Sequence, residues 1–117
     1  MNLEKLYQEM GGDMADAVRR LGGIAAVERF LRMFAGDDTF AMLQAAMSAG
    51  DARRAFRAAH TMKGVASNLG FSALAAAASE LTEILRGGSF AGADAAFIKV
   101  KAEYDKVIRA INAAKQK

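Results

Sequence analysis

The chain contains one histidine, His60, and its neighbours at helical spacing could support phosphoryl transfer. Lys63 follows three positions later and Gly64 four positions later, so in a helix both lie beside the imidazole. A neutral imidazole is a nucleophile at cellular pH, and an ammonium group beside it can meet phosphoryl oxygens. Because the side chain at position i+4 covers the helix surface over residue i, a glycine at 64 leaves the His60 ring open.

His60 is predicted to lie on the outer side of its helix. At about 100° per residue, an apolar stripe falls roughly 140 to 180° away from it. That stripe consists of Ala55, Ala58, Met62, Val65 and Leu69, with Ala59 and Ala66 at its edges. The side within about 60° of His60 carries Arg53, Phe56, Arg57, Lys63, Gly64 and Ser67. A solvated histidine without a role is the alternative interpretation of the same position.

The side that carries His60 is basic, since no acidic residue occurs between Ala52 and Leu69. Solvated helix faces usually mix charges to gain i,i+4 pairs, so this face favours an anion or an acidic partner. Phe56 is either an interface anchor or packs against the preceding helix. Gly64 costs about 1 kcal/mol relative to alanine in a helix. Close helix packing could explain it, but its place on the exposed side favours access to His60.

Glycines divide the chain into helical segments, and proline is absent. The predicted helices are Leu3 to Glu9, 14–21, Ile24 to Ala35, 39–49, Ala52 to Leu69, 73–86 and Ala93 to Ala114. The predicted N-caps are Asp13, Asp37 or Asp38, Asp51 and Ser72. The final Lys115, Gln116 and Lys117 are expected to fray.

The fold class that follows is all-α, an up-and-down four-helix bundle with additional short N-terminal helices. We expect a single domain over residues 1–117, with the core bundle at about 24–114. Three apolar stripes support it: Ile24, Val27, Leu31 and Phe34; Phe40, Leu43 and Met47; and Phe97, Val100, Tyr104, Val107 and Ile111.

Composition excludes several classes of function. There is no cysteine among the 117 residues, so disulfides and thiolate metal sites are impossible, and no metal or cofactor is expected. No apolar run approaches the roughly 20 residues that cross a bilayer, and the N-terminus lacks an apolar signal core. A net charge of +3 without a dense basic run does not demand nucleic acid. We expect a cytoplasmic protein that binds neither membrane nor nucleic acid.

The pattern His60-x-x-Lys63-Gly64, with Gly70 six residues later, resembles the HxxKGxxxxxG signature of histidine phosphotransfer (HPt) domains. Length, helix order and the Gly50-Asp51 joint before the histidine helix are also similar to that family. The resemblance implies a monomeric carrier in a multistep phosphorelay, without kinase activity of its own. It implies that His60 is phosphorylated on Nε2, that Lys63 assists the phosphoryl group and that Gly64 leaves room for docking.

The partners that the resemblance implies are receiver domains. One would donate a phosphoryl group from a phospho-aspartate, often within a hybrid histidine kinase, and a response-regulator receiver would accept it on an aspartate. Arg53, Phe56, Arg57 and Ser67 match the expected docking face by position, and their individual roles are our inference. Receiver active sites are acidic, so a basic face around His60 complements them.

Two other interpretations use the same residues. The phosphoacceptor module of a histidine kinase places an acidic residue directly after its histidine, whereas Thr61 follows His60 here. A non-catalytic helical adaptor with a basic docking face, or a weak nucleic-acid binder, would use Arg53, Arg54, Arg57 and Lys63 and would not need His60.

Glu80 and Glu83 could mimic metal ligands, but a solvated edge with a pair to a basic neighbour explains them better.

Overall fold

Glycine-bounded amphipathic segments form the helices of the chain. The computed structural model describes residues 1–115, and within them it contains seven α-helices and no strand. They are α1 (Leu3–Met10), α2 (Met14–Leu21), α3 (Ile24–Ala35), α4 (Thr39–Ala49), α5 (Ala52–Asn68), α6 (Ser72–Leu85) and α7 (Ala93–Lys115). The predicted all-helical bundle is therefore confirmed.

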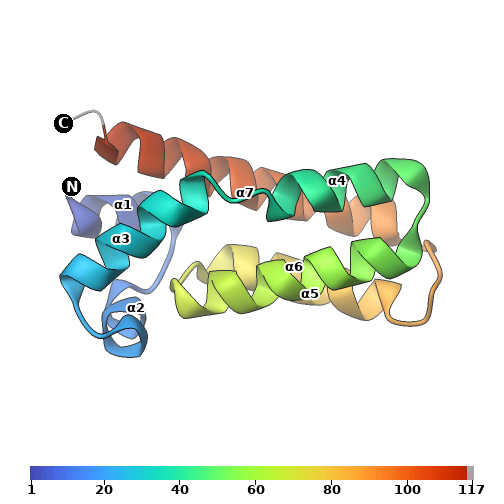
Figure 1. Cartoon of the computed structure of the whole chain (residues 1–117), viewed down its shortest axis with the longest axis horizontal. Coiled ribbons are helices and arrows are strands. Elements are labelled where there is room, and N and C mark those ends of the chain that lie inside the picture. The colour runs from blue at the N-terminus through green and yellow to red at the C-terminus, as the bar shows by residue number, and fades with distance from the viewer. Residues whose placement is uncertain (116–117) are drawn as a thin grey trace.

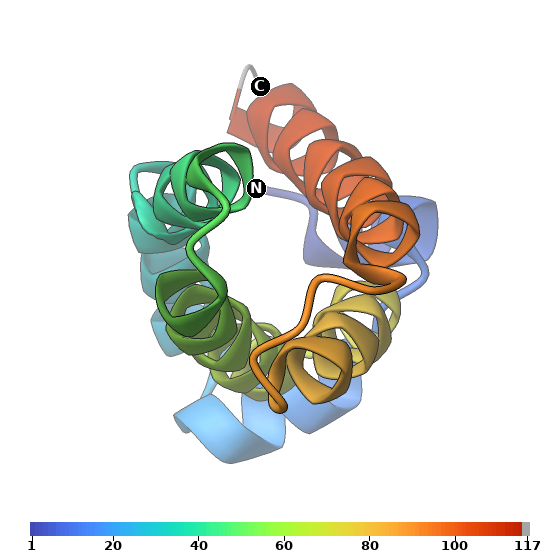
Figure 2. The same ribbon diagram turned by 90° about the vertical axis from the view of Figure 1, so that its right-hand side faces the viewer.

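Helices α4, α5, α6 and α7 surround a common core in the end-on view (Figure 2). Each is packed against its neighbour in sequence, and the contact between α5 and α6 is the most extensive. Helix α3 precedes α4 along the long axis and lies at the same end of the molecule as α1 and α2, where α1 packs on α7 (Figure 1). The histidine helix α5 is thus flanked by α4 on one side and α6 on the other.

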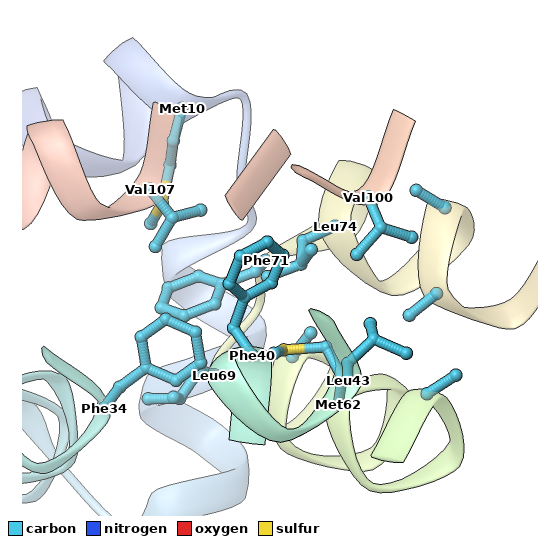
Figure 3. Close-up of a cluster of buried hydrophobic side chains, with 14 of the residues drawn as sticks. Met10, Phe34, Phe40, Leu43, Met62, Leu69, Phe71, Leu74, Val100 and Val107 are labelled. Atoms are coloured by element: carbon cyan, nitrogen blue, oxygen red, sulfur yellow. The ribbon is translucent and has the colours of Figure 1, made fainter. Parts of the chain in front are cut away.

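A chain of aromatic rings runs through the core from α1 to α4. Phe71, fully buried at the start of α6, lies 5.1 Å from Phe34 and 6.2 Å from Tyr7 between ring centroids. Phe34 continues to Tyr104 of α7 at 5.8 Å, and Tyr104 stacks on Phe40 of α4 at 4.2 Å. Figure 3 shows Phe34, Phe40 and Phe71 among the aliphatic side chains of the core. Aromatic pairs of this kind add about 0.5–1.5 kcal/mol each beyond their buried area.

The C-terminal end of α5 is joined to α1 and the α1–α2 turn by hydrogen bonds. The buried hydroxyl of Tyr7 donates to the Leu69 carbonyl at 2.6 Å, and the Asp13 N–H donates to the Gly70 carbonyl at 2.8 Å. Gly70 has φ +71°, a left-handed conformation that glycine adopts without a steric cost. A Cβ there would lie 2.3 Å from the Asp13 carbonyl oxygen, so this joint requires glycine.

The capping residues show where sequence reasoning succeeded. Asp13 and Asp51 cap α2 and α5 as predicted, since each side chain accepts a hydrogen bond from a backbone N–H three residues on. Asp38 takes the N-cap position of α4 without a capping bond, and Asp37 accepts from the Thr39 N–H instead. The prediction for Ser72 is wrong: Phe71 holds the N-cap position, because its burial in the core starts α6 one residue earlier.

Other boundaries agree with prediction to within one residue, except that Lys115, expected to fray, is the last helical residue of α7. Gln116 and Lys117 lie outside the described residues. Most stripe residues are buried or half-buried. Ile24 is the exception at 55% exposed, because it is the first residue of α3, at the corner after α2.

Candidate functional site

His60 lies exposed on α5, opposite the buried stripe of that helix. Ala55, Met62 and Leu69 are buried, and Val65 is half-buried. Ala59 and Ala66, which were expected at the edges, are also fully buried, because they lie on the flank of α5 that packs on α6. The helical geometry inferred from sequence is therefore confirmed, and a buried, hydrogen-bonded role for the histidine is excluded.

Gly64 is surrounded by open space. A Cβ built at this position would have no heavy atom within 4 Å outside its own helix backbone and chain neighbours, and the residue is exposed. Close helix packing therefore does not explain the glycine. Since residue i+4 covers residue i, a longer side chain at 64 would extend over the surface beside His60.

Basic side chains on the His60 side of α5 are not neutralised by ion pairs. Within residues 1–115, Arg53, Arg57 and Lys63 form no ion pair within 4 Å. Arg54, which lies farther round the helix, pairs with Asp51 at 3.4 Å. Arg53 and Arg57 are exposed, whereas Lys63 is half-buried. Cations without partners on this face can meet an anionic group or an acidic protein surface.

Phe56 lies between His60 and the end of α6. Its ring is parallel to the His60 imidazole, with 4° between the planes and 6.1 Å between the centroids. The guanidinium carbon of Arg86 lies 5.2 Å from the centre of the Phe56 ring. Phe56 is half-buried, and its contact with Arg86 places it against the end of α6, the following helix, and not against the preceding one.

Glu83 brings an acidic group into the basic surroundings of His60. Arg86 donates to it through Nε at 3.1 Å and Nη2 at 2.8 Å. These hydrogen bonds lower the pKa of Glu83, and the charges of Arg86 and Lys63 lower it further. The hydrogen bonds to Glu83 in turn raise the pKa of Arg86. The expectation that Glu80 and Glu83 pair with basic neighbours is correct, since Glu80 accepts from Lys99.

Sequence reasoning missed Glu83 and Arg86 as neighbours of the histidine. A helical wheel of α5 shows which residues of α5 share a face with His60, but it does not show which residues of α6 lie beside that face. The available signal was the i,i+3 spacing of a glutamate and an arginine at the end of the sixth helix. Ser67, the remaining predicted docking residue, is half-buried on the same side of α5, one turn beyond Lys63.

A groove of about 550 Å³ runs between α4 and α5, on the other side of His60 from α6. Its α4 wall includes Met42, which is 59% exposed. Its α5 wall includes Arg57 and Thr61, the residue next to the histidine. The surroundings of His60 are therefore asymmetric, with side chains of α6 on one side and an open groove on the other.

Residues 1–115 contain no group of three or more His, Cys, Asp or Glu side chains placed to hold a metal ion. No helix among them is both long enough and apolar enough to span a bilayer.

Comparison with known proteins adds one finding. The family model described as Hpt domain matches residues 3–110 of the 117-residue chain. No curated protein and no solved structure gives a significant match. The matched range includes His60, Lys63 and Gly64 and all of the helices except the end of α7.

Proposed function

This chain belongs to the Hpt domain family, and we propose that His60 is its phospho-acceptor. Family membership places it in phosphorelay histidine phosphotransfer, as a phosphocarrier and not a kinase. Under the proposal, a phospho-aspartyl receiver domain donates the phosphoryl group to His60. The aspartate of another response-regulator receiver then takes it. The exposed imidazole beside the uncovered backbone of Gly64 is the observation that carries this proposal.

The chemistry needs one nucleophilic nitrogen and an unobstructed approach. The Nε2 lone pair of neutral His60 attacks phosphorus, and an N–P bond forms as the bond from phosphorus to the aspartyl oxygen breaks. The carboxylate leaves with that electron pair, while Nδ1 of the ring keeps its proton. In the second transfer an aspartate oxygen attacks phosphorus and Nε2 regains its lone pair.

Lys63 and Gly64 have separate roles in this proposal. Lys63 lies one turn from His60 and has no ion-pair partner among the described residues, so its ammonium can meet the phosphoryl oxygens. Gly64 lies at +40° from His60 around the helix, on the side of the α4–α5 groove. Its missing side chain leaves a path along which a receiver aspartate can approach.

The docking face is proposed to consist of Arg53, Phe56, Arg57 and Ser67. Its exposed arginines have no ion-pair partners within residues 1–115, which suits the acidic active site of a receiver. The groove between α4 and α5 is continuous with this face through Arg57 and adds an apolar wall beside it. A receiver that presents apolar residues next to its acidic pocket would therefore bury both kinds of surface.

Transfer of labelled phosphoryl from a phosphorylated receiver tests the proposal. We expect the native chain to acquire an acid-labile label and the His60→Gln variant to acquire none, because glutamine retains a polar side chain without a nucleophilic ring nitrogen. Label in the variant at the native level would refute the assignment. Receiver binding by the native chain without any labelling would instead support the adaptor alternative.

A further inference from the structure

We propose that Arg86 is a positioning residue that acts through Phe56 to hold the His60 ring toward the open groove. This inference rests on the proposed function and adds a residue from α6 to the site. Arg86 is the C-cap residue of α6, exposed at the surface. It touches neither the imidazole nor the predicted docking residues of α5 other than Phe56 in the contacts described.

The geometry forms a stack of three flat groups that ends on the catalytic ring. Arg86 covers one ring, Phe56, and that ring lies parallel to His60. Phe56 and His60 are four residues apart on the same helix, where side chains meet. A guanidinium over an aromatic face is attracted by the ring quadrupole, so Arg86 restricts the rotation of Phe56. A restricted Phe56 in turn limits the rotamers open to the imidazole.

Glu83 fixes the orientation of the guanidinium through hydrogen bonds at its edge. Its carboxylate receives two hydrogen bonds from Arg86, through Nε and Nη2, which sets the plane of the guanidinium. A lysine at 86 could keep the charge but not this two-point geometry. The pair therefore turns a flexible surface arginine into a fixed contact.

The stack occupies only one side of the histidine. Around α5, Phe56 and Lys63 lie at −40° and −60° from His60, toward α6, whereas Gly64 and Arg57 lie at +40° and +60°. The groove between α4 and α5 opens on the latter side. A ring held by Phe56 from the α6 side therefore presents its free edge where Gly64 leaves the approach clear.

The test separates ring positioning from receiver docking. In Arg86→Gln, we expect the maximal rate of phosphoryl acceptance to fall about two- to fivefold, with the half-saturating receiver concentration unchanged. The exposed Arg109→Gln on α7 is the matched control and should change neither quantity. A raised half-saturating concentration at an unchanged maximal rate would make Arg86 a docking contact and overturn the proposal.

NMR of the unphosphorylated protein provides a readout that does not depend on phosphotransfer. The His60 ring-proton shifts should move in Arg86→Gln, because the ring current of a released Phe56 changes at the imidazole. Unchanged shifts would overturn the positioning role even if His60 proves to be the acceptor. If His60 is not the acceptor, labelling fails while the NMR shifts still report on the stack.

A double-mutant cycle tests whether Arg86 acts on His60 through Phe56. Phe56→Leu keeps apolar volume but removes the flat ring, so it should reproduce the loss of maximal rate seen in Arg86→Gln, and any additional change in the half-saturating receiver concentration belongs to its place in the docking face. Combining the two should add nothing further, because both interrupt the same stack. Additive losses would show that Arg86 acts independently of Phe56 and would contradict the proposal.

Discussion

Gly64 lies within α5 and Gly70 in the turn that follows it, but one has open space around it and the other is tightly enclosed. A Cβ at Gly64 would meet nothing within 4 Å, whereas a Cβ at Gly70 would lie 2.3 Å from the Asp13 carbonyl oxygen. Gly70 has a left-handed φ of +71°, while Gly64 lies within α5. Gly70 lies in a closed backbone joint with the α1–α2 turn, and Gly64 lies on an open basic surface beside His60.

This difference separates what the fold needs from what the proposed chemistry needs. The structure requires glycine at 70, because both its conformation and the nearby carbonyl exclude a side chain. At 64 the structure would accept alanine, and the helix would gain stability from it. A residue that costs stability without a packing reason is expected where function limits the choice of side chain.

The largest loss of stability is expected when a side chain is added at Gly70, in the joint at the end of α5. Gly70→Ala should lower the free energy of unfolding by about 3 kcal/mol or more, because left-handed strain and a backbone clash combine. Urea unfolding followed by circular dichroism measures it. Gly11→Ala is the matched control, since Gly11 has φ +66° with nothing within 4 Å of a Cβ, and should cost only about 1–2 kcal/mol. Equal losses would show that the Asp13 contact contributes nothing.

A smaller loss is expected from removing the side-chain bond at the same joint. Tyr7→Phe should lower the free energy of unfolding by about 1–2 kcal/mol, because it leaves the buried Leu69 carbonyl without the Tyr7 hydroxyl. Burial raises the pKa of Tyr7 in the folded chain. Its stabilisation is therefore complete below the unfolded value of about 10 and declines as the pH rises above it. The difference between native and variant should narrow above pH 10, and a constant difference would contradict this assignment.

On the open side, blocking the surface should reduce transfer without unfolding the helix. Gly64→Leu should slow phosphoryl acceptance about tenfold or more, because it obstructs the approach to His60. Its free energy of unfolding should equal or exceed the native value, and Gly64→Ala should raise it by about 0.5–1 kcal/mol. Stability by urea unfolding and transfer rate should thus change in opposite directions. An unchanged rate in Gly64→Leu would show that access to the ring is not the reason for this glycine.

The smallest effect is expected at the edge of the docking face. Arg57→Glu should weaken receiver binding about three- to fivefold at low salt, because it reverses an exposed charge that faces an acidic partner. The difference should diminish as salt is raised, since exposed charges are screened. Binding titrations across a salt series measure it, with Arg109→Glu on α7 as the control. A loss that persists at high salt would indicate a packing defect in place of charge steering.

Much of the open region could be predicted from the sequence, because it depends on one helix. The periodicity of α5 correctly placed His60 opposite Ala55 and Met62, and the absence of a packing partner at Gly64 followed from its exposed angle. Local signals also located most helix boundaries, since glycines and aspartates act within a few residues of their positions. The prediction of Ser72 as the N-cap of α6 failed because the burial of Phe71, a tertiary effect, decided where the helix begins.

The closed joint and the α6 side of the site could not be predicted in this way. The bond from Tyr7 to Leu69 links residues 62 positions apart, and no local pattern specifies such a pairing. Gly70 resembles an ordinary helix stop in the sequence, and its contact with Asp13 forms only when the end of α5 packs against the α1–α2 turn. Arg86 likewise reaches Phe56 across an interhelical contact whose register depends on the packing of α5 on α6.

In the proposed function, the imidazole of His60 carries the phosphoryl group. Incubating the ¹⁵N-labelled chain with a phosphorylated receiver and recording ³¹P and ¹⁵N NMR spectra of its histidine tests this claim directly. We predict a phosphorus–nitrogen coupling at Nε2 of His60 that disappears on acidification. Phosphoryl groups on another side chain, or a receiver that loses its phosphoryl group while the His60 resonances stay unchanged, would contradict it.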